Sequence, residues 1–168
     1  ETALDELGDI VQEFLVESHE NLDQLDRDLV ALEQTPGSRA LLSSIFRTIH
    51  TIKGTSGFLA FNRLERVTHV GESLLARLRD GAQLMTPATT DALLRMVDTV
   101  RNLLASVEEN GTDDGGDIEP VIEQVTQCIV GGPGQGGSGQ GGSGQGGTAQ
   151  GATAQGGSAP VAAAPAAV

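Results

Sequence analysis

Apolar side chains recur every three or four residues through most of the first 130 residues, which is the spacing of one face of an α-helix. The longest row predicts a first helix that starts near the N-terminus and stops at the Pro36-Gly37 pair. A row of this length is typical of a helix that packs in a bundle. Its members are Leu4, Leu7, Val11, Phe14, Ser18, Leu22, Leu25, Leu29 and Leu32.

Three further rows predict a second, a third and a fourth helix. Ser38 is a good N-cap for the second helix, because its hydroxyl can accept a hydrogen bond from a free N–H of the first turn. Asn62 can cap the third helix, with Glu65 three residues later as in a capping box. Thr86 and Pro87 give the fourth helix a cap and a first-turn proline. The rows are Leu42, Ile45, Ile49 and Ile52; Leu64, Val67, Gly71, Leu74 and Leu78; and Leu93, Val97, Val100, Leu104 and Val107.

The remaining signals complete an all-α fold. Asp80-Gly81 and Asn110-Gly111 are expected to end the third and fourth helices. After the second break, Asp117 can cap a short fifth helix, whose row is Val121, Ile122, Val125 and Ile129. Aromatic residues make up only 2% of the chain and no alternation of period two is sustained, so no sheet is expected. The prediction is a four-helix antiparallel up-down bundle with a fifth short C-terminal helix on its side or end.

The composition changes abruptly near residue 130. From Gly131 to Val168 there is no Asp, Glu, Lys or Arg, and Gln recurs at every fifth position from 135 to 155. Such a segment has too few apolar side chains to offset the entropy of ordering. We therefore expect a folded domain at 1–130 and a disordered, flexible Gly/Gln/Ser/Ala/Pro-rich linker at 131–168. A match to the dinucleotide-binding pattern G-x-G-x-x-G at 132–137 is rejected, because no helix follows it.

Charge and cysteine content narrow the class of partner. The formal net charge of −13 argues against binding to nucleic acid or to an anionic membrane, so proteins are the expected partners. The single Cys128 forms no internal disulfide, and no apolar run is long enough to span a membrane. These features fit a cytoplasmic, monomeric domain.

The chain starts without Met and without a signal-peptide pattern, so we expect an excised fragment. The three histidines lack metal-site spacing, and no metal is expected.

His50 is the candidate for chemistry, because it lies well away from the apolar row of the second helix on a helical wheel. Its surface strip holds Phe46 one turn before it, and Lys53, Gly54 and Gly57 after it. A helical side chain leans toward the N-terminus, so Gly54 at i+4 leaves the imidazole uncovered. Each glycine inside a helix costs about 1 kcal/mol relative to Ala. Two of them in four residues favour clearance for a partner protein.

The third helix offers carboxylates to this histidine. Glu65, His69 and Glu72 share a face away from the apolar row, and this face can border the second helix. A hydrogen bond to a carboxylate can hold the proton on one ring nitrogen and leave the other nitrogen nucleophilic. Lys53 is a cation one turn from His50 that can steady a phosphoryl group. Together these residues indicate a phosphoacceptor site.

The run from Phe46 to Phe61, Phe-Arg-Thr-Ile-His-Thr-Ile-Lys-Gly-Thr-Ser-Gly-Phe-Leu-Ala-Phe, followed by Leu64 and by Thr68-His-Val-Gly-Glu72, resembles the histidine phosphotransfer (HPt) domain of CheA-type chemotaxis kinases. The resemblance extends from about Phe14 to Leu104. It implies these roles: phosphoacceptor for His50, carboxylate at its Nδ1 for Glu72, nearby cation for Lys53, site-lining residue for His69 and clearance for Gly54.

In that family the HPt domain is a substrate. The resemblance implies that the ATP-binding kinase domain of the same or a sister chain phosphorylates His50 with ATP and Mg²⁺, and that a response-regulator aspartate then takes the phosphoryl group. The segment alone is expected to bind no cofactor and to be non-catalytic, and its parent protein to be a protein histidine kinase. Two alternatives stay open: a helical docking or oligomerisation module in which His50 is inert, and a chain that is itself a kinase or phosphatase. No nucleotide-binding motif supports the latter.

Overall fold

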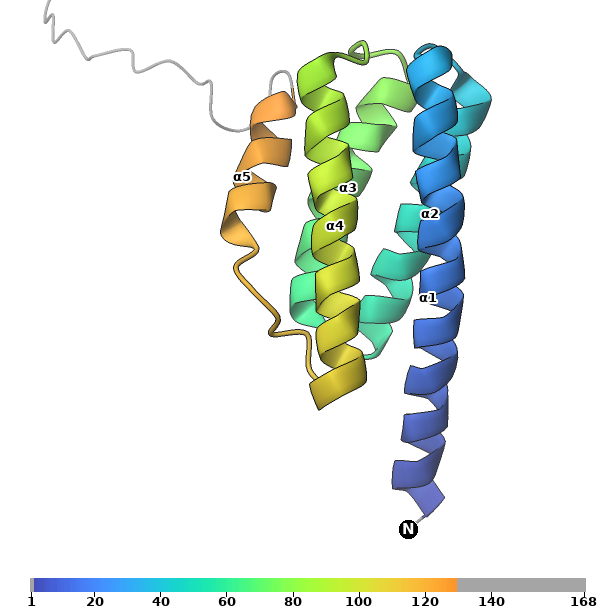
Figure 1. Ribbon diagram of the computed structural model, residues 1–168, viewed down its shortest axis with the longest axis vertical. Helices are drawn as coiled ribbons and strands as arrows, with labels where there is room; N and C mark the ends of the chain where they lie inside the picture. The colour runs from blue at the N-terminus through green and yellow to red at the C-terminus, as the bar shows by residue number, and fades with distance from the viewer. Residues whose placement is uncertain (1, 130–168) are drawn as a thin grey trace, which may run out of the picture. The chain divides into compact units, whose positions relative to one another are not determined.

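The computed structural model describes residues 2–129, with side chains from residue 5 onward, and all regular structure in this range is helical (Figure 1). The predicted linker at 131–168 lies outside the described residues. The helices are α1 (Thr2–Gln34), α2 (Arg39–Phe58), α3 (Asn62–Arg79), α4 (Pro87–Asn110) and α5 (Glu119–Cys128). The predicted all-α fold class is confirmed.

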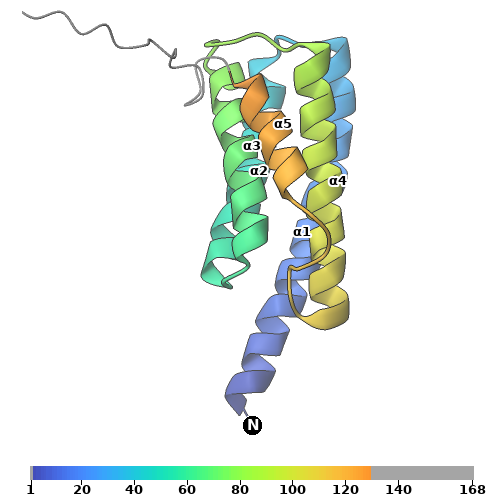
Figure 2. The same ribbon diagram turned by 90° about the vertical axis from the view of Figure 1, so that its left-hand side faces the viewer.

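The first four helices form an antiparallel bundle. Helix α2 packs against α1 and α3, and α4 packs against α3 and α1, so the four helices enclose one core (Figures 1 and 2). Helix α5 lies along the side of the bundle against α3 and α4, as Figure 2 shows. No helix within residues 2–129 has the length and hydropathy that crossing a membrane requires.

The predicted apolar rows of α2, α3 and α4 form the core. Leu42, Ile49, Leu64, Leu74 and Leu104 are all buried, together with the remaining members of these rows. The row of α3 contains a glycine because α4 approaches it closely there. A Cβ added to Gly71 would lie 2.0 Å from the Sδ atom of Met96, so any side chain at this position would displace Met96.

The first helix departs from the prediction at its N-terminal end. Its apolar row is buried from Phe14 to Leu32, but Leu7 is 51% exposed and its neighbour Ile10 is 43% exposed. Phe14 stacks on Phe61 in the connection between α2 and α3, with the ring centroids 5.9 Å apart. Residues before Phe14 therefore extend past the end of the α2–α3 hairpin (Figure 1). The prediction that Leu7 packs in the bundle is wrong, because the spacing continues beyond the helices that could cover it.

Most of the predicted helix ends are confirmed. Ser38 and Thr86 each accept a hydrogen bond from the backbone N–H three residues later, at 3.3 and 3.2 Å. Asp117 accepts one at 3.0 Å from the backbone N–H two residues later, where α5 begins. Gly81 and Gly111 have φ angles of +74° and +75°, which glycine adopts without steric cost. The local rules for starting and ending helices hold at these positions.

The start of α3 is the exception. Asn62 is the first residue of the helix, Phe61 occupies the cap position, and no side chain of either caps the helix. The carboxylate of Asp113, in the connection between α4 and α5, instead accepts hydrogen bonds from the backbone N–H groups of Arg63 and Leu64, at 2.8 and 3.0 Å. The prediction that Asn62 caps α3 is wrong, because the cap comes from a residue 49 to 50 positions later.

Replacing Asp113 by Ala is expected to lower the free energy of unfolding by about 1 kcal/mol, because two N–H groups of α3 lose their acceptor. Urea denaturation followed by circular dichroism measures this change. Asp113→Asn keeps an acceptor oxygen and should lose less. Asp98→Ala, which removes an exposed carboxylate from α4, controls for the change in charge. Equal stability of Asp113→Ala and Asp98→Ala would contradict a distant cap.

Candidate functional site

His50 projects from α2 into solvent. The preceding residue, Ile49, is completely buried in the core, and the side chain of His50 is 60% exposed. Ile49 fixes the rotation of the helix about its axis, so the imidazole is presented to an approaching molecule without any rearrangement of the bundle. The predicted outward position of His50 is confirmed.

Glu72 reaches His50 from the neighbouring helix. The Nδ1 atom of His50 lies 3.0 Å from the Oε2 atom of Glu72, and the Glu72 side chain is only 18% exposed. A carboxylate oxygen only accepts hydrogen bonds, so the ring proton sits on Nδ1. In the neutral ring the lone pair is then on Nε2. The geometry therefore gives an exposed imidazole whose nucleophilic nitrogen is the one turned away from Glu72.

Lys53 binds the same carboxylate oxygen. Its Nζ atom lies 2.9 Å from Oε2 of Glu72, and its side chain is 22% exposed. Burial acts to raise the pKa of Glu72, but the hydrogen bonds and charges of Lys53 and His50 together hold that pKa below its ordinary value. The ammonium group is thus held by the Glu72 carboxylate. Its first effect is to keep Glu72 ionised.

Two further side chains build the opposite side of the imidazole. The Phe46 ring, one turn before His50, stacks on it with 5.9 Å between the ring centroids and 11° between the ring planes. The guanidinium carbon of Arg79 lies 4.2 Å from the centroid of the Phe46 ring. Helical spacing identifies Phe46 as a neighbour of His50. Arg79 was missed, because it comes from the last turn of α3 and only the antiparallel packing of α2 and α3 brings it here.

The two glycines of the strip have different surroundings. A Cβ added to Gly54 would meet nothing within 4 Å, so the surface next to His50 is open. A Cβ added to Gly57 would lie 3.3 Å from Cδ of Glu65. The role of Gly54 in leaving room for a partner at the imidazole stays a prediction. The space at Gly57 is bordered by a side chain of this chain itself.

None of the described contacts links the rings of the other two histidines to this cluster. His69 is exposed on α3, and among the described contacts none joins its ring to His50. Its predicted place in the site stays a prediction. His19 on α1 lies 3.8 Å from Glu108 on α4. Within residues 2–129, no group of three or more His, Cys, Asp or Glu side chains is arranged to hold a metal ion.

Comparison with known proteins finds matches to the part of the chain that contains His50, Lys53 and Glu72. The family model described as "Hpt domain" matches residues 9–103. The sensor histidine kinase CheAY of Helicobacter pylori is 41% identical over 124 residues, which are 74% of this chain and 15% of that protein. The chemotaxis protein CheA of Halobacterium salinarum is 31% identical over 119 residues, which are 71% of this chain and 18% of that protein. The matched part of the chain thus spans less than a fifth of the length of these relatives.

Two solved structures have the same fold. The solution structure of the histidine phosphotransfer domain of CheA matches with a TM-score of 0.63 and 27% identity, and covers 68% of this chain and 86% of that one. The phosphorylated P1 domain of CheA3 from R. sphaeroides, crystallised in complex with CheY6, matches with a TM-score of 0.66 and 26% identity. The match covers 71% of this chain and 94% of that one.

Replacing Lys53 by Met is expected to raise the pKa of Glu72, because burial persists while the lysine hydrogen bond and charge are lost. A ¹³C NMR titration of the Glu72 carboxyl group measures the shift. Arg47→Met, which removes an exposed cation from the same helix, is the control and should leave this pKa nearly unchanged. A Glu72 pKa that is the same in Lys53→Met as in the wild type would contradict the assigned cause.

The same ion pair should make stability depend on pH. The pKa of Glu72 is lower in the folded state than its ordinary value, so its stabilising effect is complete above the ordinary value of 4.5. That effect is lost as the pH falls through the lowered value. The difference in free energy of unfolding between the wild type and Lys53→Met should therefore be largest near neutral pH and shrink in acid. Urea denaturation at a series of pH values measures this difference. A difference that does not change with pH would contradict the prediction.

Proposed function

The chain belongs to the Hpt domain family and is homologous to the phosphotransfer domains of CheA proteins, and from this we propose that it is the phosphoacceptor domain of a chemotaxis-type histidine kinase. His50 takes a phosphoryl group from ATP bound to the kinase domain and passes it to an aspartate of a response regulator. The observation that carries the proposal is the pairing of an exposed imidazole with the carboxylate of Glu72 at its Nδ1 atom.

The lone pair of His50 Nε2 attacks the γ-phosphorus of ATP. A nitrogen–phosphorus bond forms, the bond from phosphorus to the bridging oxygen breaks, and ADP leaves with the bonding electrons. The imidazole, now substituted on Nε2 and protonated on Nδ1, carries a positive charge that the Glu72 carboxylate at 3.0 Å stabilises. In the second step an aspartate oxygen of the regulator attacks phosphorus, and Nε2 takes back its electron pair.

The partners follow from this chemistry. The kinase domain, of the same or a sister chain, supplies the nucleotide and Mg²⁺, so this segment needs no cofactor of its own. A response regulator is the second partner; the related P1 domain of CheA3 has been crystallised with CheY6, which supports this assignment. The domain works as a monomeric substrate in the cytoplasm. Gly54 leaves room for both partners at the imidazole, and His69 borders their approach from α3.

Lys53 acts in this scheme through Glu72. Its ammonium group, 2.9 Å from Oε2, keeps the carboxylate ionised and so keeps the proton of His50 on Nδ1. When His50 carries a phosphoryl group of about two negative charges, the same cation lies one turn away and offsets part of that charge. The lysine is therefore a positioning residue before transfer and an electrostatic partner after it.

His50→Gln should abolish labelling of the chain by a CheA kinase core supplied with radioactive ATP and Mg²⁺, since the glutamine amide is not a nucleophile. The wild-type label should be stable in alkali and labile in acid, as expected for phosphohistidine. His19→Gln, at a histidine 42% exposed on α1, is the control and should be labelled normally. Labelling of His50→Gln at the wild-type rate would refute the proposal. A chain that takes no label but still binds the kinase core would be a docking module.

Glu72→Ala should slow the labelling of His50 by about tenfold or more while the bundle stays folded. A hydrogen bond to a charged group contributes about 1.5–3 kcal/mol, and 1.4 kcal/mol corresponds to a factor of ten. Glu72→Gln, which keeps an acceptor oxygen without the charge, should give an intermediate rate. Glu20→Ala on α1 is a control for loss of an exposed carboxylate. Equal labelling rates for Glu72→Ala and Glu20→Ala would show that the carboxylate does not assist the reaction.

A further inference from the structure

The charges of the chain are strongly segregated between its helices. Residues 39–79, which form the α2–α3 hairpin, hold seven of the ten Lys and Arg residues and only two of the 23 Asp and Glu residues. The hairpin therefore has a formal charge of +5, within a chain whose total is −13, so all other residues together carry −18. The only strongly cationic part of the sequence is the part that presents His50.

Within the hairpin, two arginines share the surface strip of His50. Arg39 and Arg47 precede His50 by eleven and three positions, which on an α-helix of 3.6 residues per turn places both within about 60° of it. Both side chains are exposed. Both line a shallow groove along α2, together with hydroxyl residues that include Ser43 and Thr48. An open surface with two cations thus lies on α2 in the turns that precede His50.

The charges of these two arginines are not cancelled by the fold. Lys53, Arg66 and Arg79 form ion pairs with carboxylates, at 2.8 to 3.0 Å. Among residues 2–129, no carboxylate lies within 4.0 Å of the guanidinium groups of Arg39 or Arg47.

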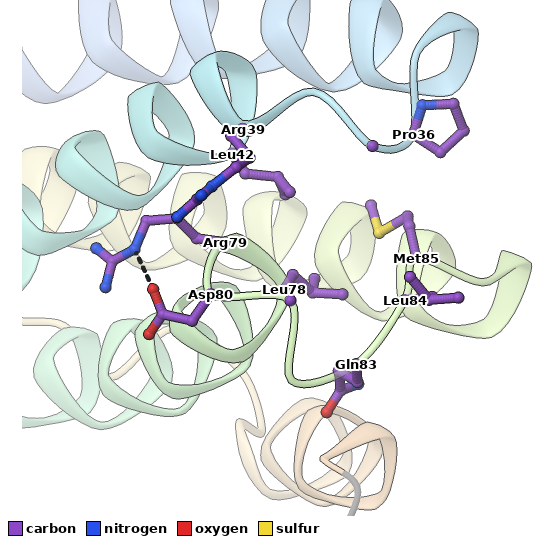
Figure 3. Close-up of a pocket in the computed structure, with 11 residues that line it drawn as sticks. Pro36, Arg39, Leu42, Leu78, Arg79, Asp80, Gln83, Leu84 and Met85 are labelled. Atoms are coloured by element: carbon purple, nitrogen blue, oxygen red, sulfur yellow. Dashed lines mark hydrogen bonds and ion pairs between the residues drawn. The ribbon is translucent and has the colours of Figure 1, made fainter. Parts of the chain in front are cut away.

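The environment of Arg39 shows the same lack of compensation. In Figure 3, Arg39 and Arg79 line one pocket at the end of the bundle, and the dashed line joins Arg79 to Asp80. Arg39 influences Asp80 only at longer range. Its position is also unfavourable for the helix, because it is the first residue of α2, where the helix dipole favours a carboxylate. The helix dipole therefore does not account for a cation here.

We propose that Arg39 and Arg47 form a docking strip for the face of a response regulator that carries the acceptor aspartate; this inference rests on the proposed function. Phosphorylated His50 carries about two negative charges, and the acceptor is itself a carboxylate, so the two reacting groups repel each other. Cations in the turns before His50 lower this repulsion while the regulator approaches the domain. The acidic surface of α1, α4 and α5 repels the same partner, so the net field steers the regulator to α2.

Phosphoryl transfer from the chain, first labelled on His50, to a purified CheY response regulator tests the strip. The second-order rate constant is measured at an ionic strength of about 0.01 M and of about 0.15 M, where the Debye length falls from about 30 Å to about 8 Å. Arg39→Glu/Arg47→Glu should lower the low-salt constant at least tenfold and remove its decrease with salt. The transfer rate at saturating regulator should be unchanged, because neither residue contacts the reacting atoms.

Arg27→Glu/Arg95→Glu is the matched control. It changes the total charge equally, at exposed arginines of α1 and α4 that donate to neutral glutamines. The proposal is overturned if the low-salt rate constant falls equally in this control, or if it does not fall in Arg39→Glu/Arg47→Glu. A lower transfer rate of Arg39→Glu/Arg47→Glu at saturating regulator would also overturn it. So would an equal slowing of His50 labelling by the kinase core, which would assign the strip to that partner. Failure of the proposed function appears earlier, as a wild-type chain that takes no label on His50.

Discussion

One carboxylate oxygen holds the site together. Oε2 of Glu72 lies 3.0 Å from Nδ1 of His50 and 2.9 Å from Nζ of Lys53, so a single atom on α3 fixes two side chains of α2. The arrangement requires that α2 and α3 keep their register, and the buried rows that include Ile49, Leu74 and Leu75 provide this. The bundle core is thus what sets the tautomer of an exposed imidazole. A histidine on a less constrained surface would share its proton between both ring nitrogens.

The residues on the two sides of His50 along α2 have different roles. Toward the N-terminus of α2, Phe46 stacks on His50 and is itself covered by Arg79, which limits rotation of the ring. Toward the C-terminus, a Cβ added to Gly54 would meet nothing within 4 Å, so the surface of the next turn of α2 is open. Support and access therefore come from opposite directions along one helix. This explains how a side chain that is 60% exposed can be both well oriented and reachable by another protein.

The fold and the centre of the site could be predicted from the sequence because their signals are local. The apolar period predicted the helices and the outward position of His50. The shared face of α3 offered Glu65, His69 and Glu72 as candidates, and the resemblance to HPt domains singled out Glu72. Three features depend on packing between distant segments and could not be found this way. Asp113 caps α3 from another connection, Arg79 covers Phe46 from the far end of α3, and Leu7 is exposed because α1 extends past its neighbours. Local rules carry no information on which element ends where in space.

A phosphoacceptor of this kind needs no cleft for recognition, and the distribution of charge over its helices can take that role. Both proposed partners must bring an active site to His50, so a pocket on this chain would obstruct them. Recognition can then use the open surface on α2 near His50, where long-range electrostatics acts before any contact is made. A helix hairpin of charge +5 in a chain of −13 meets that requirement. The acidic helices around it strengthen the same effect, because they repel a negatively charged partner from the other faces.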